Sequence, residues 1–155
     1  MSLVISDSTT IITLINIDRL DVLSNIFSRV YIPKKVHEEI SKRERIVLNR
    51  DFFVTKEIKD KKLYKILHKS LDEGECEAIV LAKEMELSLI IDEKKGRKIA
   101  NSLGINIFGF IGLLVLNFKR KKLLKDDVTD IFFKAKEQGF RVSSSLEKDF
   151  LDLIQ

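Results

Sequence analysis

The sequence predicts an α/β fold in which helices cover both faces of a parallel β-sheet. Several short runs of residues are apolar at nearly every position, which is typical of strands buried on both faces. Helical patterns of apolar residues separate these runs, as in successive strand–helix–strand units. Two of the runs end directly on an aspartate, Asp7 and Asp92. Together these observations predict a sheet whose carboxyl edge carries acidic side chains.

The first strand is expected at residues 3–6, where a run rich in β-branched residues stops at Asp7. Apolar residues at helical spacing follow at 10–17 and 20–27, and the pattern breaks near Asp18. Two short helices are therefore expected before the second strand.

The second strand is expected at residues 30–32. Pro33 suits the first position of a helix that runs to about Lys42, because a missing N–H costs nothing there. Val36 faces inward on this helix, and Glu39, three residues later, lies beside the same face.

Residues 52–54 are a third strand candidate, and 58–71 have the pattern of an amphipathic helix. Residues 72–82 start with acids and continue as an apolar body, which predicts a buried helix with carboxylates at its positive end. The fourth strand is expected at 87–92.

A helix over residues 93–103 and a fifth strand over 104–108 follow. The apolar helix expected at 109–118 is too short to span a bilayer. Two more helices, at 126–136 and 143–154, complete the chain.

With 155 residues, the chain is expected to form one domain, residues 1–155, with 124–155 as a C-terminal helical extension packed on it. It has no apolar run of 18–20 residues and no sequence typical of a signal peptide, so we expect a cytoplasmic protein without membrane contact. Cys76 is the sole cysteine, which excludes an internal disulfide and a thiolate metal cluster. The net charge of +4 permits phosphate-bearing partners without requiring them.

Four acids are expected to gather at the carboxyl edge of the sheet: Asp7, Glu39, Glu75 and Asp92. The carboxyl ends of parallel strands share one edge, and helices begin there as well. Carboxylates about 5 Å apart repel by roughly 3 kcal/mol per pair at an effective dielectric near 20, so the cluster requires a cation or a shared proton. Oxygen ligands without cysteine or a suitably placed histidine favour Mg²⁺ or Mn²⁺ over zinc.

Each acid also has a purely structural explanation. Asp7 and Asp92 could cap the helices that follow them, and Glu75 could serve only the helix dipole. Glu39 could be solvated, and Asp72 is interpreted as a capping residue.

Cations accompany the acids at this edge: Lys34, Lys35, Lys94, Lys95, Arg97 and Lys98. Lysines in the first turn of a helix oppose its dipole by a few tenths to about 1 kcal/mol each. A bound phosphate backbone would compensate, although the lysines could equally be solvated surface. The two histidines, His37 and His68, are expected on the surface.

Five segments occur in the order and at the spacing found in one known family: Val4–Thr9, Ile32–Ile40, Gly74–Ile79, Ile90–Arg97 and Gly139–Ser143. They resemble the PIN-domain proteins, and most closely a prokaryotic branch with a Gly-Glu-x-Glu-Ala helix and an Asp-x-x-x-Gly-Arg turn. The resemblance covers nearly the whole chain. It implies a Rossmann-like, three-layer fold with five parallel strands, a Mg²⁺- or Mn²⁺-dependent nuclease site at the carboxyl edge, and commonly a homodimer.

Many relatives are toxins of the VapC type, which cut RNA and are silenced by an antitoxin. The resemblance places the four family acids on Asp7, Glu39, Glu75 and Asp92. Many members have aspartate at the third place, and Glu77 is a rival for it because the register near Gly74 can slip.

A fifth acid of some relatives is absent, and Lys94 lies in its neighbourhood. Ser8 or Thr9 matches a family hydroxyl beside the first aspartate. The resemblance therefore implies a metal-dependent endoribonuclease, with a catalytically weak RNA- or protein-binding module as the alternative. A phosphatase of the haloacid-dehalogenase type is disfavoured, because it usually has a second aspartate where Thr9 stands.

Overall fold

The computed structural model describes residues 2–44 and 48–155. Its strands form one sheet in the order β3-β2-β1-β4-β5, and every neighbouring pair is parallel. The strands are β1 (Ser2–Ser6), β2 (Phe27–Pro33), β3 (Phe53–Lys56), β4 (Leu89–Ile90) and β5 (Ile107–Phe108). The predicted α/β fold with five parallel strands is confirmed.

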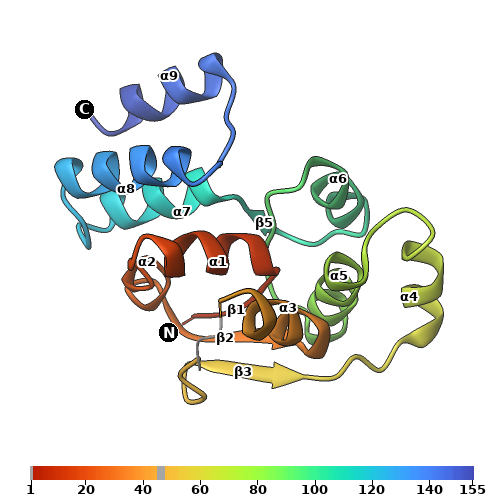
Figure 1. Cartoon of the computed structure of the whole chain (residues 1–155). Coiled ribbons are helices and arrows are strands. Elements are labelled where there is room, and N and C mark those ends of the chain that lie inside the picture. Colours follow the sequence, from red (N-terminus) through yellow and green to blue (C-terminus); the bar gives the residue numbers. More distant parts are fainter. Residues whose placement is uncertain (1, 45–47) are drawn as a thin grey trace.

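Helices connect the strands and complete the chain (Figure 1). They are α1 (Ser8–Asn16), α2 (Asp21–Ser24), α3 (Lys34–Glu44), α4 (Lys61–Leu67), α5 (Glu73–Met85), α6 (Lys94–Ser102), α7 (Phe110–Lys119), α8 (Lys125–Glu137) and α9 (Ser144–Leu153). Within the described part of the chain, no helix combines the length and the apolar character needed to cross a membrane.

The sheet separates two hydrophobic cores, as expected for strands buried on both faces. Val4 of β1 and Ile90 of β4 pack with α1, α3 and α7, whereas Ile5 and Leu89 pack with α5 and α6. Successive side chains of a strand point to opposite faces, which explains the continuous apolar runs. Cys76 is a free, buried thiol in the second core, as predicted.

Several elements differ in extent from the sequence-based prediction. β4 is limited to Leu89–Ile90 where 87–92 was expected, and β5 to Ile107–Phe108 where 104–108 was expected. β2 begins at Phe27, which was expected in a helix, and Pro33 ends β2 rather than starting α3. Pro33 can occupy the last position of the strand because its pairing with Lys56 closes the ladder there. The helix expected at 58–71 shortens to α4, because Ile58 is buried from a loop and the Asp60 side chain caps the helix by accepting from Leu63 N–H.

Helices α8 and α9 pack on α7, and their Phe132 and Phe150 side chains lie fully buried in the same core as Ile11. The connection from α8 to α9 therefore lies close to the start of α7, where Phe140 contacts Phe110 at a ring-centroid distance of 4.9 Å.

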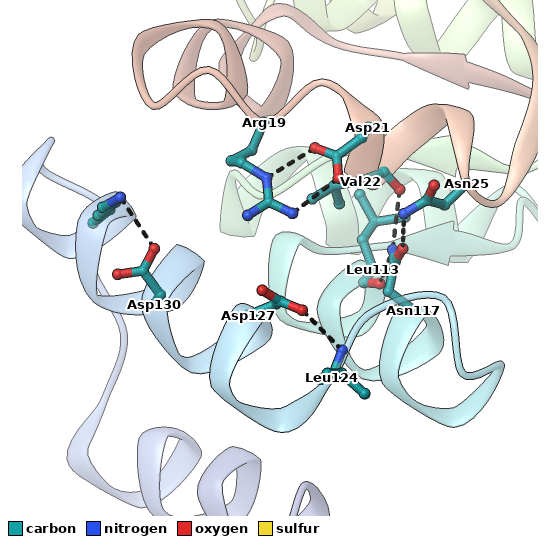
Figure 2. Close-up of polar contacts among 10 residues, drawn as sticks. Arg19, Asp21, Val22, Asn25, Leu113, Asn117, Leu124, Asp127 and Asp130 are labelled. Carbon is teal, nitrogen blue, oxygen red and sulfur yellow. Dashed lines mark hydrogen bonds and ion pairs between the residues drawn. The ribbon is translucent and has the colours of Figure 1, made fainter.

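A buried amide fixes α7 against α2 (Figure 2). The Asn117 side chain donates to the carbonyl oxygens of Val22 and Leu113 and accepts from the Asn25 amide at 3.0 Å. The Asn117 amide is fully buried, and both its nitrogen and its oxygen form hydrogen bonds. These hydrogen bonds fix the orientation of α7 relative to α2. The start of α7, which reaches the carboxyl edge of the sheet, is thereby held in place.

Candidate active site

Asp7 is the most buried of the acids at the carboxyl edge. It follows β1, caps α1, and is only 5% exposed, with its Oδ1 accepting the Ser8 N–H at 2.7 Å. Burial raises the pKa of Asp7 to about 7, against the opposing effect of the Ser8 N–H, and the charges of Glu39, Asp72 and Asp92 raise it further. Asp7 is thus both a helix cap and the centre of an acidic cluster.

Glu39 reaches this cluster from α3. Its Oε2 accepts a hydrogen bond from the Ser8 hydroxyl at 2.8 Å. A Cβ built on Gly74 would overlap Glu39 Oε1, so the start of α5 approaches the carboxyl group closely and a larger residue there would displace it. Burial raises the pKa of Glu39, although the Ser8 hydroxyl opposes the rise.

Asp92 follows β4 and is held by two hydrogen bonds from other elements. Its Oδ2 accepts from the Thr10 hydroxyl at 2.9 Å, and its Oδ1 accepts from the Phe110 N–H at 3.0 Å. Asp92 therefore caps α7 rather than the helix that follows it in sequence, whose cap is Glu93. These bonds fix the carboxylate between α1 and α7.

Glu75 lies in the first turn of α5, where the Asp72 side chain caps the helix by accepting from the Glu75 N–H at 2.8 Å. Burial raises the pKa of Glu75 to about 9, and contacts with the carboxyl groups of Asp72 and Glu93 and the charge of Asp7 contribute. The negative charges that gather here therefore raise the pKa of Glu75 in the same direction as its burial does.

The Oε2 atom of Glu75 is buried and has no hydrogen-bond partner among the described residues. It also lies close to α6, since a Cβ on Gly96 would be 3.1 Å from it. A buried oxygen without a donor is costly unless a proton or cation reaches it.

The acids fit a divalent cation in their chemistry. Every candidate ligand is a carboxylate oxygen, which favours Mg²⁺ or Mn²⁺. Burial is the largest cause of the raised pKa values of Asp7 and Glu75, and neighbouring carboxylates raise both further. However, no three acidic, histidine or cysteine side chains within residues 2–44 and 48–155 converge closely enough to hold one ion together, so joint coordination requires side-chain rotation.

Glu77, the rival third acid, has a different environment. Its Oε1 accepts from the Lys35 N–H at 3.0 Å, so it binds the start of α3. Glu75, by contrast, faces Asp72 and Glu93. The geometry favours Glu75 as the acid of the cluster.

The expected cations occupy different positions. Lys35 forms ion pairs with Glu73 at 2.8 Å and with Glu38 at 3.9 Å. Arg97 is partly buried and approaches Gly109, where a built Cβ would lie 3.2 Å from Arg97 Nη1 and 3.1 Å from Asp92 Oδ1. The remaining four lysines are exposed: Lys34, Lys94, Lys95 and Lys98. His37 and His68 are exposed, as expected.

The sequence analysis missed three residues that act on the acidic cluster. Asp72 was taken only as a cap, yet its charge raises the pKa of Asp7, Glu39 and Glu75. Glu93 both caps α6 and faces Glu75, and the Thr10 hydroxyl holds Asp92. Thr10 lies three residues after Asp7, one helical turn into α1, and that spacing was the available signal.

The sequence was also compared with known proteins. A family model described as PIN domain matches residues 3–155. No curated protein matches the chain.

Proposed function

The chain belongs to the PIN-domain family, whose members are generally nucleases that use divalent metals, and we propose that it is a Mg²⁺- or Mn²⁺-dependent ribonuclease cleaving RNA phosphodiester bonds. Its metal ligands and catalytic acids are Asp7, Glu39, Glu75 and Asp92. The observation that supports this most strongly is the group of four carboxylates, two from helices and two from strand ends, that includes the buried Asp7. None of these four carboxylates forms an ion pair with a described lysine, arginine or histidine.

Each acid has a distinct role in this proposal. When bound, the cation supplies an activated water and stabilises the charge on the scissile phosphate. Asp7 and Asp92 are the rigid ligands, since backbone N–H groups and the Thr10 hydroxyl fix their oxygens. Glu39 and Glu75 are the two candidate proton acceptors. Glu39 Oε2 already accepts a hydrogen bond from the Ser8 hydroxyl, whereas Glu75 Oε2 accepts none in the described part of the chain.

The exposed cations bind the RNA backbone in this proposal. Lys94 and Lys95 begin α6 and Lys34 begins α3, so bound phosphates would offset the unfavourable interaction of these lysines with the helix dipoles. Lys98 and Arg97 extend the same positive surface along α6. Lys35 contributes less, because Glu73 and Glu38 already neutralise it.

The more specific assignment, a VapC-type toxin that acts in the cytoplasm as a homodimer and is silenced by an antitoxin, is supported by the motif resemblance alone. Expression of the chain in a bacterial host tests it. The toxin assignment predicts growth arrest that Asp7→Asn abolishes, and unimpaired growth with soluble, active protein would contradict it.

A catalytically weak RNA- or protein-binding module is the second candidate. The observation that favours it is that no three acidic side chains among the described residues converge on one point. The absence of a fifth family acid, with Lys94 in its neighbourhood, agrees with weaker metal binding.

A hydrolysis assay on labelled RNA separates the two candidates. The ribonuclease proposal predicts cleavage with Mg²⁺ or Mn²⁺, none with a chelator, and loss of cleavage in Asp7→Asn. The matched control is Asp51→Asn, which removes an exposed carboxylate outside the cluster. Equal rates for the parent and Asp7→Asn would contradict the enzyme proposal.

A further inference from the structure

A cleft of about 600 Å³ begins beside the acidic cluster. Its walls come from the start of α6, the end of β5, the first turn of α7 and the connection between α8 and α9. Asp92 forms part of one wall, so the cleft opens directly from the proposed metal site. Figure 1 shows the connection between α8 and α9 on the same side of the molecule as β5 and α6.

The cleft combines apolar walls with two arginines. Its apolar side chains are Ile107, Phe108, Ile111, Phe140 and Leu146. Phe140 is held by Phe110 and Phe132, at ring-centroid distances of 4.9 and 6.5 Å, so one aromatic wall is fixed by the core.

Arg97 and Arg141 supply the positive charge. In the described part of the chain, neither side chain forms an ion pair, and neither donates a side-chain hydrogen bond. Glu93 also lines the cleft, but both of its oxygens accept backbone N–H groups, those of Lys95 and Gly96. The cleft therefore holds two carboxylates and two guanidinium groups, and because neither guanidinium is engaged in an ion pair or a side-chain hydrogen bond among the described residues, both can bind a phosphate.

We propose that this cleft binds one nucleotide of single-stranded RNA, adjacent to the scissile phosphate. The base lies against Phe140, and Arg97 and Arg141 bind the flanking phosphates. Stacking of a base on an aromatic side chain is tolerant of sequence, and unpaired bases alone are free to enter such a cleft. This inference rests on the proposed function, because it assigns the substrate strand of the same site.

Gly112 of α7 offers a direct way to block the cleft. It lines the cleft, and a Cβ built on it has no heavy atom within 4 Å. A larger side chain at this exposed helical position extends into open space and does not disturb the core. Gly112→Leu is therefore the blocking variant, and Gly112→Ala is its matched control.

The binding test uses the Asp7→Asn chain, in which cleavage is suppressed, and a fluorescent single-stranded RNA of ten nucleotides read by anisotropy. We expect Gly112→Leu and Arg141→Gln each to weaken binding by about tenfold, the effect of losing one stacked base or one phosphate contact. Gly112→Ala and Arg120→Gln, an exposed arginine after α7, should stay within about twofold of the parent. Arg141→Gln should also reduce the salt dependence of binding by about one released ion.

An RNA that carries one abasic position locates the base. We expect a single position, adjacent to the cleaved bond, at which loss of the base weakens binding and at which Gly112→Leu has no further effect. Unchanged binding by both Gly112→Leu and Arg141→Gln would overturn the proposal. If circular dichroism shows that Gly112→Leu does not fold, the binding of Arg141→Gln and of the abasic RNAs tests the proposal instead.

Failure of this proposal is distinguishable from failure of the ribonuclease proposal. Metal-dependent cleavage with no effect of the cleft variants would refute the nucleotide site alone. Cleft-dependent binding of RNA without cleavage by the parent chain would refute the enzyme and retain the site.

Discussion

Replacing Asp7 by Asn is expected to stabilise the folded protein at pH 8 while it removes the proposed activity. Asp7 is buried, and its pKa is raised from 3.8 to about 7, chiefly by burial and also by neighbouring carboxylates. Asn keeps the shape of the side chain and remains a good helix cap, so the hydrogen bond from the Ser8 N–H is retained. The substitution therefore removes mainly the cost of a buried charge.

The sign follows from proton linkage. Between pH 3.8 and about 7, the folded chain holds a proton on Asp7 that the unfolded chain has released, so the free energy of unfolding falls as the pH rises. At 1.36 kcal/mol per pH unit, the loss reaches roughly 4 kcal/mol above pH 7. Asp7→Asn should therefore be more stable than the parent by about 2–4 kcal/mol at pH 8, with a smaller difference at pH 5.

Urea denaturation followed by circular dichroism, at pH 5 and pH 8 with a chelator present, measures this difference. The urea dependence of the free energy should be the same for both chains, which shows that the folded and unfolded states are comparable. Asp51→Asn is the control, and it should change the free energy of unfolding by less than about 0.5 kcal/mol. A parent chain as stable as Asp7→Asn at pH 8 would refute the assignment of Asp7 as a buried, uncompensated carboxylate.

Three further predictions concern the same edge. Mn²⁺ or Mg²⁺ at about 100 times its dissociation constant should raise the free energy of unfolding of the parent by about 2.7 kcal/mol at pH 8, and the gain should be lost in Asp7→Asn. Gly74→Ala should reduce RNA cleavage, because its Cβ overlaps Glu39 Oε1 and forces the carboxyl group to move. The change in the free energy of unfolding should stay within about 1 kcal/mol, since the end of the Glu39 side chain can rotate away, and unchanged cleavage would contradict the close approach. Thr10→Val removes the hydrogen bond to Asp92 Oδ2. It should lower RNA cleavage and reduce the free energy of unfolding by about 1 kcal/mol in urea denaturation, with RNA affinity unchanged. Unchanged cleavage would show that this hydrogen bond does not position Asp92.

The sequence predicts the fold well because burial on both faces leaves a local signature. The run at residues 3–5 is apolar since Val4 and Ile5 enter different cores, and the same holds for Leu89 and Ile90. The boundaries of β2 and α4 are predicted less well. Phe27 fits a helical pattern locally, and only its parallel pairing beside Ser2 of β1, which lies far away in sequence, places it in a strand.

The acids at strand ends are predictable because topology alone brings them to one edge. Their partners are not, since hydrogen bonds such as Thr10 to Asp92 join residues 82 positions apart. The role of Asp72 shows a further limit: as a helix cap it looks fully explained, yet its carboxylate also acts on three other acids. The cleft depends on Phe140 and Arg141 meeting α6 and α7, a contact that no local pattern reveals.

A crystal of the full chain soaked in Mn²⁺ and measured at the manganese absorption edge tests the central claim most directly. We predict an anomalous peak at the carboxyl edge of the sheet, within coordination distance of Asp7 and Asp92 and of at least one of Glu39 and Glu75. A fully soaked crystal without a peak there, or with manganese bound only to other surfaces, would contradict it.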